Sequence, residues 1–179
     1  GKSTLVSILY GFYGADSGTI RINGETTTIR NSADAIGKGI GMVHQHFMLV
    51  PNFTVLENVM LGREGSLSVE TGARKAREAL NKLSLDFGLA VDPDMIVEDL
   101  PVGLQQRVEI LKALMNGADL LILDEPTSVL TSQESRDLFQ NFREMRERGH
   151  MIILISHKLD EIIELCDRVT VLQKGKVVG

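Results

Sequence analysis

In the second half of this 179-residue chain, a short apolar run ending in two carboxylates is followed by a helical segment and a second apolar run. The two runs read LLILDEP and MIILISH. Between them, Ser132 suits a helix N-cap and Gly149 suits the end of that helix. The apolar positions of this helix are Leu138, Phe142 and Met145. Because strand, helix and strand in this order form a right-handed crossover, the sequence predicts an α/β fold with a parallel sheet.

The composition of the chain favours a globular protein and argues against several other classes of protein. The hydrophobic content of 43% and charged content of 24% are typical of globular domains. A net charge of -5 argues against a basic surface for nucleic acid, so no nucleic-acid partner is expected. No apolar run approaches the ~18 to 20 residues that span a bilayer, so we expect a soluble protein or one that reaches a membrane through partners. The single cysteine, Cys166, excludes an internal disulfide and favours a reducing compartment.

Residues 1–45 predict a short helix, a hairpin and a buried strand, which we interpret as the start of the α/β core. Asn23-Gly24 lies between two runs rich in Thr and Ile, a strong hairpin signal that predicts an antiparallel edge unit. The run IGMVHQ predicts a buried strand that ends at Gln45. The helix before them has its apolar positions at Leu5, Ile8, Leu9 and Phe12.

Residues 46–115 predict a mostly helical subdomain, and residues 116–179 the remainder of the core. One helical apolar stripe comprises Ala73, Ala76, Leu80, Leu83 and Phe87. A second comprises Leu104, Val108, Leu111 and Met115. Near the end of the chain, a helical face of Leu159, Ile162, Ile163 and Cys166 precedes RVTVLQKGKVV, which predicts a strand and a turn.

The opening quartet GKST can bind phosphate. Backbone N–H groups at a helix N-terminus attract phosphate, the Lys2 ammonium would neutralise its charge, and the Ser3 hydroxyl would contact magnesium. Taken alone the quartet is equally compatible with an ordinary turn and helix cap.

Two adjacent acids end the strand LLILD. Asp124 suits a contact to magnesium, and Glu125 suits polarisation of an attacking water. Carboxylates at the end of a buried strand need a cation, a polar partner or water. The alternative to a magnesium site is therefore that both carboxylates lie at a strand end and are solvated by bulk water.

Gln45 and His157 end the two other predicted strands. The carboxyl ends of parallel strands form one ligand crevice, so we expect His157 to face the same place as Asp124 and Glu125. Single histidines are more often structural, and each residue alone would be unremarkable. The joint order raises the functional interpretation above these alternatives.

With these motifs in order, the chain resembles the nucleotide-binding domain of ATP-binding cassette (ABC) proteins over essentially its whole length. The resemblance implies a RecA-like P-loop NTPase core with an antiparallel edge unit and an inserted α-helical subdomain. It implies ATP and Mg²⁺ as cofactors, with Gln45 as the Q-loop residue, Glu125 as the catalytic glutamate and His157 as the switch histidine. The phosphate-binding residues would be Gly1, Lys2, Ser3 and Thr4, and the magnesium ligands Ser3, Gln45 and Asp124.

The signature motif of that family departs from its usual form here. It reads LPVGLQQR, so Pro101 stands where the family has a serine that reaches the γ-phosphate. Proline offers neither a hydroxyl nor an N–H group. Gly103 and the helix N-terminus after it stay available to bind the phosphate held by a second cassette, in trans. Thr131 also stands where the family often has aspartate.

The variant motifs resemble the ATPases of bacterial simple-sugar and nucleoside importers. That resemblance implies a second cassette in tandem, transmembrane permease subunits, an extracytoplasmic solute-binding protein acting indirectly, and a peripheral location on the cytoplasmic face of the bacterial membrane. It also calls for a strand, an adenine-stacking aromatic residue and a glycine-rich segment before Gly1. We therefore expect a fragment, cut at the N-terminus and also at the C-terminus, that binds nucleotide weakly by itself.

Two alternatives share these motifs. One is a soluble cassette that acts on ribosomes or nucleic acid, against which the acidic balance stands. The other is a non-catalytic or degenerate-site cassette, which Pro101, Val102 and Leu104 suggest.

Overall fold

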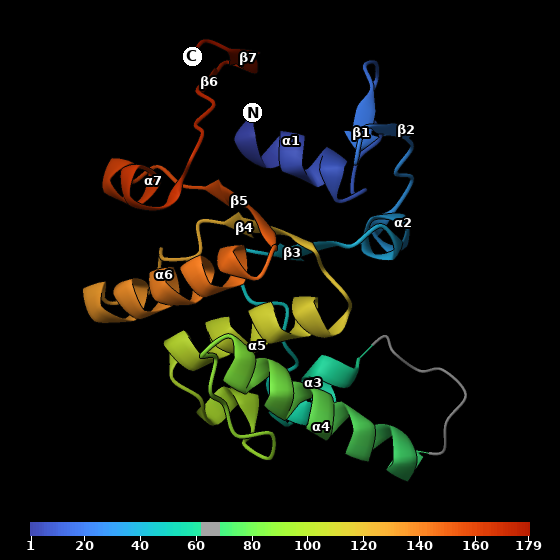
Figure 1. Cartoon of the computed structure of the whole chain (residues 1–179), viewed down its shortest axis with the longest axis vertical. Coiled ribbons are helices and arrows are strands. Elements are labelled where there is room, and N and C mark those ends of the chain that lie inside the picture. Colours follow the sequence, from blue (N-terminus) through green and yellow to red (C-terminus); the bar gives the residue numbers. More distant parts are fainter. Residues whose placement is uncertain (62–68) are drawn as a thin grey trace.

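A parallel sheet lies at the centre of the molecule. The computed structural model describes residues 1–61 and 69–179. The sheet has the order β3 (Ile40–Val43), β4 (Leu120–Asp124) and β5 (Met151–Ile155), and both pairings are parallel. Helix α1 (Lys2–Leu9) lies on one face of this sheet, and α5 (Val102–Met115) and α6 (Ser132–Glu147) lie on the other (Figure 1). The predicted α/β fold with a parallel sheet is therefore confirmed.

Strands β3 and β4 are largely buried on both faces, as apolar runs flanked by helices require, whereas β5 is mostly half-buried. Leu121 and Leu123 belong to a core cluster that includes Phe142 of α6. Ile122, between them, belongs to a second cluster that includes Val6 of α1. This alternation follows the two-residue period of a strand and fixes one helix layer on each side of the sheet.

Helix α6 (Ser132–Glu147) begins one residue earlier than we predicted. Its N-cap is Thr131, whose side chain accepts a hydrogen bond from the Glu134 N–H, and the Glu134 carboxylate accepts one from the Thr131 N–H. Ser132 as N-cap was wrong because only Thr131 has the acidic partner three residues later that completes this reciprocal cap. The helix ends as predicted, with Gly149 at a φ of 91°.

The middle of the chain is mostly helical, as predicted. It contains α3 (Val55–Met60), α4 (Val69–Asp86), the short 3₁₀ helix η1 (Val97–Asp99) and α5 (Val102–Met115). The part of the prediction that falls on residues 62–68 lies outside the described residues. Figure 1 shows these helices stacked beneath the sheet. One continuous core cluster joins them to it, and the boundaries 1–45, 46–115 and 116–179 stay predictions.

Asn58 ties the segment before α3 to that helix. It is fully buried, its Oδ1 atom accepts a hydrogen bond from Val50 N at 2.7 Å, and its Nδ2 atom donates to Val50 O at 3.0 Å. The same Nδ2 atom donates to Thr54 O at 3.0 Å. A single amide side chain thus supplies the partners that this irregular backbone lacks.

The predicted hairpin is present at the edge of the fold. Strands β1 (Ile20–Ile22) and β2 (Glu25–Thr27) pair antiparallel. Asn23 and Gly24 between them have φ angles of 52° and 85°. These positive values are what a two-residue type I′ turn requires. The chain then continues through α2 (Ser32–Gly37) into β3.

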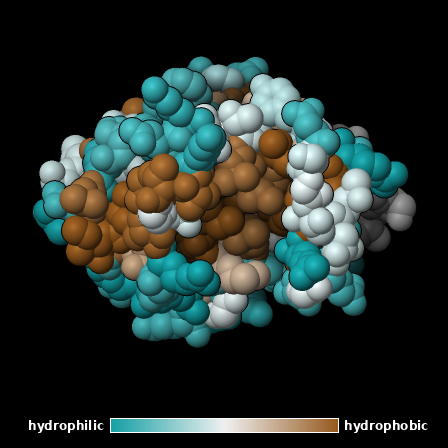
Figure 2. Space-filling model, turned by 90° about the horizontal axis from the view of Figure 1, so that it is seen from above, coloured by the Kyte–Doolittle hydropathy of each residue, from teal (hydrophilic) through white to brown (hydrophobic). Residues whose placement is uncertain are grey.

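Two predicted apolar faces at the ends of the chain are only partly buried. In α1 (Lys2–Leu9) the buried residue is Val6, while Leu5 is 48% exposed and Phe12 lies beyond the helix. In α7 (Leu159–Leu165), Leu159 and Ile163 are exposed. Spacing identifies a possible apolar face, but the packing of the whole element decides whether it is covered. Figure 2 views the end of the molecule that carries α1 and α7, and apolar surface runs across it.

The chain ends in a small antiparallel pair, β6 (Leu172–Gln173) and β7 (Lys176–Val177), as the predicted strand and turn require. Among the helices of the described ranges, none is both long and apolar enough to cross a membrane.

Candidate functional site

Three side chains from the ends of three neighbouring strands meet at one edge of the sheet. The Oε1 atom of Glu125, after β4, lies 3.0 Å from Nδ1 of His157, after β5. Gln45, after β3, donates from Nε2 to the other oxygen of Glu125 at 3.5 Å. The parallel strands bring their carboxyl ends together. Gln45 and His157, which are 80 and 32 positions from Glu125 in sequence, therefore both contact its carboxylate.

The backbone holds Glu125 in an unusual conformation. Its φ is 49°, in the left-handed region that costs a non-glycine residue about 1 kcal/mol or more. Its N–H donates to Ile155 O at 2.9 Å, which ties the end of β4 to the end of β5. The turn redirects the side chain from the strand toward His157, and this strained geometry is typical of functional positions.

Gly1, Lys2, Ser3 and Thr4 form the exposed start of α1 and open onto the same edge. Lys2 Nζ donates to Ser156 O at 3.2 Å, and Ser156 immediately precedes His157. No side chain caps the first turn of this eight-residue helix. Uncapped N–H groups beside an ammonium fit a phosphate group, so this part of an ATP site is compatible with the residues present.

Asp124 ends β4 beside this group. Its pKa is raised above the ordinary value by burial and by the charge of Glu125, and the charges of His44 and Lys2 oppose that rise. A bound cation would favour the ionised carboxylate in the same way.

The donor set also fits Mg²⁺. Within residues 1–61 and 69–179 no three His, Cys, Asp or Glu side chains are grouped closely enough to hold a metal by themselves. Mg²⁺ prefers one or two carboxylates with water and substrate phosphates, so a single aspartate supported by the Ser3 hydroxyl and the Gln45 amide suits it.

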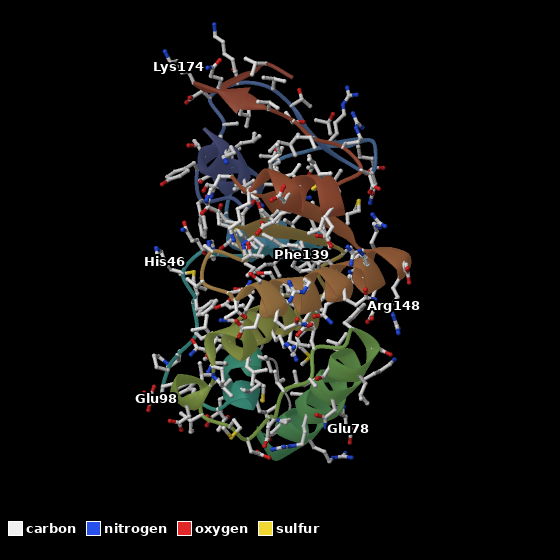
Figure 3. All side chains as sticks on the ribbon, turned by 90° about the vertical axis from the view of Figure 1, so that its left-hand side faces the viewer. His46, Glu78, Glu98, Phe139, Arg148 and Lys174 are labelled. Atoms are coloured by element: carbon white, nitrogen blue, oxygen red, sulfur yellow. The ribbon has the colours of Figure 1, made fainter. Side chains whose placement is uncertain are left out.

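The two histidines beside Gln45 have structural or surface positions. The ring of His44 stacks on Phe12 with centroids 5.5 Å apart, and burial lowers the pKa of His44 while Asp124 opposes the shift. His46 is exposed and projects from the edge of the molecule (Figure 3). In the part of the chain that the structure describes, neither ring is hydrogen-bonded to Glu125.

Gly103 lies in the first turn of α5, away from this group. Pro101 is the N-cap of that helix and supplies no side-chain capping hydrogen bond, although its carbonyl accepts hydrogen bonds from the N–H groups of Leu104 and Gln105. A Cβ atom placed on Gly103 would lie 2.5 Å from Oε1 of Glu134, so the start of α5 packs against the start of α6. The structure does not bring Gly103 to Glu125, and its expected role in trans stays a prediction.

Two sets of polar residues that support the site were not predicted from the sequence. Behind Glu125 and His157, the carboxylate of Glu161 accepts hydrogen bonds from the hydroxyls of Thr127 and Ser156. The signal was the serine directly before His157 and the glutamate one helical turn after it. In a sequence, hydroxyl groups next to proposed catalytic residues are easily taken for groups that contact only solvent.

The second missed set lies after Gln45. Buried Glu109 of α5 accepts a hydrogen bond from Met48 N at 2.6 Å, and Lys112 Nζ donates to Met48 O at 3.1 Å. These bonds attach the backbone after Gln45 to α5. Glu109 occupies a position between apolar residues of a helical stripe, which could have singled it out.

Comparison with known proteins identifies the family of this chain. The family model described as ABC transporter matches residues 1–128. The nucleoside import ATP-binding protein NupA of Lactococcus lactis is 47% identical over 178 residues, which are 99% of this chain and 35% of that protein. The ribose import ATP-binding protein RbsA 1 of Burkholderia thailandensis is 48% identical, over 100% of this chain and 36% of that protein. The chain thus spans about a third of the length of these relatives.

Solved structures give the same result. A nucleotide-free ATP-binding cassette from an ABC transporter superposes with a TM-score of 0.85 at 25% identity, over 100% of this chain and 75% of that one. A dimeric ATP-binding cassette in a post-hydrolysis state, bound to ADP and Pi, superposes with a TM-score of 0.76 at 26% identity, over 99% of this chain and 78% of that one. By sequence and by fold, the chain belongs to the ABC transporter family.

Proposed function

We propose that this chain is part of an ATPase that hydrolyses Mg-ATP at the edge of the sheet where Glu125, His157 and Gln45 meet. The observation that carries the proposal is the contact of the two Glu125 oxygens with His157 and Gln45, together with the hydrogen bond that ties Lys2, at the start of α1, to Ser156 O. A carboxylate fixed in this way can orient a water for attack on a phosphoryl group.

Each side chain has a separate task in the proposed reaction. Glu125 orients the attacking water and accepts its proton, and His157 and Gln45 keep the carboxylate in position. Lys2 leaves Ser156 O and binds phosphate oxygens together with the N–H groups of α1. Mg²⁺ held by Ser3, Gln45 and Asp124 would neutralise phosphate charge. Positioning and charge stabilisation carry most of the catalysis.

The relatives support a role in import. Their names describe nucleoside, guanosine and ribose import ATP-binding proteins, and they are more than 40% identical to this chain. We therefore propose a simple sugar or a nucleoside as the transported solute. The expected partners are transmembrane permease subunits and, through them, an extracytoplasmic solute-binding protein, at the cytoplasmic face of the bacterial membrane.

Coupling would run from the nucleotide to the permease through the segment after Gln45. Glu109 and Lys112 attach this segment to α5, whose first turn carries Gly103. We propose that residues 46–115 act as the helical subdomain that contacts the permease. Gly103 would bind the phosphate held by a second cassette, in tandem on the same polypeptide.

A second candidate function is that of a degenerate-site cassette. Its signature motif would then belong to a composite site that does not hydrolyse ATP. Pro101 supports it, because this N-cap supplies no side-chain hydrogen bond at the start of α5. In that case the full-length protein would hydrolyse ATP at one of its two composite sites only. Removing the catalytic glutamate of each cassette in turn, in a single-turnover assay, separates the two arrangements.

Transport is tested with the full-length protein and its permease subunits in sealed vesicles. We expect ATP-dependent accumulation of labelled ribose or a labelled nucleoside, and membrane association that requires the permease. ATP hydrolysis without any permease-dependent association with membranes would contradict the import role and leave the ATPase assignment intact.

A further inference from the structure

Glu161 is a buried carboxylate that the proposed reaction does not use. Its residue is only 7% exposed, in the first turn of α7. A buried carboxylate destabilises a protein unless it has partners, so its surroundings need an explanation. Glu164, one turn later on the same helix, is exposed and pairs with Arg143.

Three donors from two loops converge on the Glu161 carboxylate. The Thr127 hydroxyl donates to Oε1, and the Ser156 hydroxyl donates to Oε2 at 2.8 Å. Lys158 Nζ lies 3.1 Å from Oε1 and also donates to Thr127 O at 3.1 Å. Each carboxylate oxygen therefore has a partner, and the two hydroxyls come from segments 29 positions apart in sequence.

These partners stand next to the residues of the proposed reaction. Thr127 is two positions after Glu125, and Ser156 is directly before His157. The carbonyl of Ser156 also accepts the hydrogen bond from Lys2. Glu161 thus joins the chain segment after β4 to the chain segment after β5. These segments carry Glu125 and His157, whose side chains lie 3.0 Å apart.

The carboxylate is held in its charged form. Burial opposes ionisation, but hydrogen bonds from Thr127, Ser156 and Lys158 outweigh it and keep the pKa of Glu161 below its ordinary value. An ionised carboxylate accepts hydrogen bonds only, so both hydroxyls must point toward it. Charge-assisted bonds of this kind are shorter and stronger than neutral ones and fix geometry more firmly.

We propose that Glu161 is a positioning residue for ATP hydrolysis, which holds the loops after β4 and β5 so that Glu125 and His157 stay in contact. This inference rests on the proposed function of those two residues. It differs from a purely structural role of anchoring α7, because it assigns the effect of Glu161 to the rate of the chemical step.

The first test compares Glu161→Ala with Glu164→Ala in the full-length protein. Glu161→Ala should lower kcat for ATP hydrolysis about tenfold, because the loops after β4 and β5 lose the carboxylate that joins them, and leave the KM for ATP within about twofold. Glu164→Ala, which removes an exposed carboxylate from the same helix, should match the unaltered protein. Equal kcat values for both variants and the unaltered protein would overturn the proposal.

The second test asks whether Glu161 acts through His157. In a His157→Ala background, Glu161→Ala should change kcat less than about twofold, since the contact it supports is already gone. The same loss in both backgrounds would assign Glu161 to a general structural role and reject the proposal.

A third pair of variants keeps the test valid if Glu161→Ala folds poorly. Thr127→Val removes the hydroxyl and keeps the side-chain shape, whereas Thr127→Ser keeps the hydroxyl. Thr127→Val should lower kcat and Thr127→Ser should restore most of it. Equal rates for the two variants would contradict the proposal.

A Glu125→Gln variant distinguishes failure of the proposed role of Glu161 from failure of the proposed ATPase function. If this variant loses hydrolysis while Glu161→Ala keeps full kcat, only the role of Glu161 fails. If Glu125→Gln itself keeps the normal rate, the proposed function fails and the inference built on it fails as well.

Discussion

Oε1 of Glu125 and Nδ1 of His157, from the ends of two neighbouring parallel strands, lie 3.0 Å apart. His157 is exposed, whereas the side chain of Glu125 is 24% exposed. The histidine therefore reaches in from solvent and holds a carboxylate whose backbone is itself fixed by a bond to Ile155 O. A water molecule bound at this carboxylate would therefore contact a side chain that is held in a single orientation.

Removing the histidine ring should slow hydrolysis without preventing nucleotide binding. His157→Ala deletes one of the two partners of the Glu125 carboxylate and leaves Gln45 in place. We expect kcat to fall by roughly 10²-fold, the usual effect of losing a positioned catalytic group, with the KM for ATP little changed. Steady-state hydrolysis by the full-length protein measures both, and a tenfold rise in KM at constant kcat would show that His157 serves binding instead.

Asn58 should be essential for the stability of the segment that follows Gln45. Asn58→Ala leaves half-buried backbone groups of Val50 without their Asn58 partner, so the free energy of unfolding should fall by about 3 kcal/mol. Asn52→Ala, at an exposed position in the same segment, is the matched control and should change stability by less than about 0.5 kcal/mol. Urea denaturation of both variants gives the comparison, and equal midpoints would reject the role of Asn58.

Glu109 should make stability depend on pH in a defined direction. Burial raises the pKa of Glu109 from its ordinary 4.5, and the charge of Lys112 and the hydrogen bond from Met48 N oppose that rise. The folded state therefore holds this proton to a higher pH than the unfolded state does. The contribution of protonated Glu109 to the free energy of unfolding is fully present below pH 4.5. It is lost as pH rises through the raised pKa of Glu109 in the folded state.

Glu109→Gln tests that dependence, since an amide oxygen can still accept the Met48 hydrogen bond but does not titrate. The stability of Glu109→Gln relative to the unaltered protein should increase as pH rises from 4.5 toward neutral. Glu98→Gln removes an exposed carboxylate and serves as control (Figure 3). Thermal denaturation at a series of pH values measures the difference, and a difference that shrinks with rising pH would reverse the sign.

Local patterns predicted the sheet and the edge where the side chains meet. The apolar runs that became β4 and β5, with a helix between them, allow one topology, and parallel strands must place Glu125 and His157 at the same edge. The hairpin at Asn23 and Gly24 was equally predictable because few residues adopt positive φ readily. These features depend on short-range rules alone.

Features that depend on long-range contacts were not predictable in the same way. The left-handed φ of Glu125 follows from a hydrogen bond to another strand, which no local pattern encodes. The hydroxyls that contact Glu161 come from two separate loops. The exposed face of α7 looked like a core face because helical spacing marks apolar residues without showing what lies opposite them.

Hydrolysis by a Glu125→Gln variant of the full-length protein tests the central claim most directly, with ATP binding measured on the same preparation. The amide keeps the size of the side chain and can still contact His157 and Gln45, but it cannot accept a proton from water. We expect kcat to fall by at least about 10²-fold while the affinity for ATP stays within about twofold. A variant that hydrolyses ATP at the normal rate would show that Glu125 is not the catalytic carboxylate.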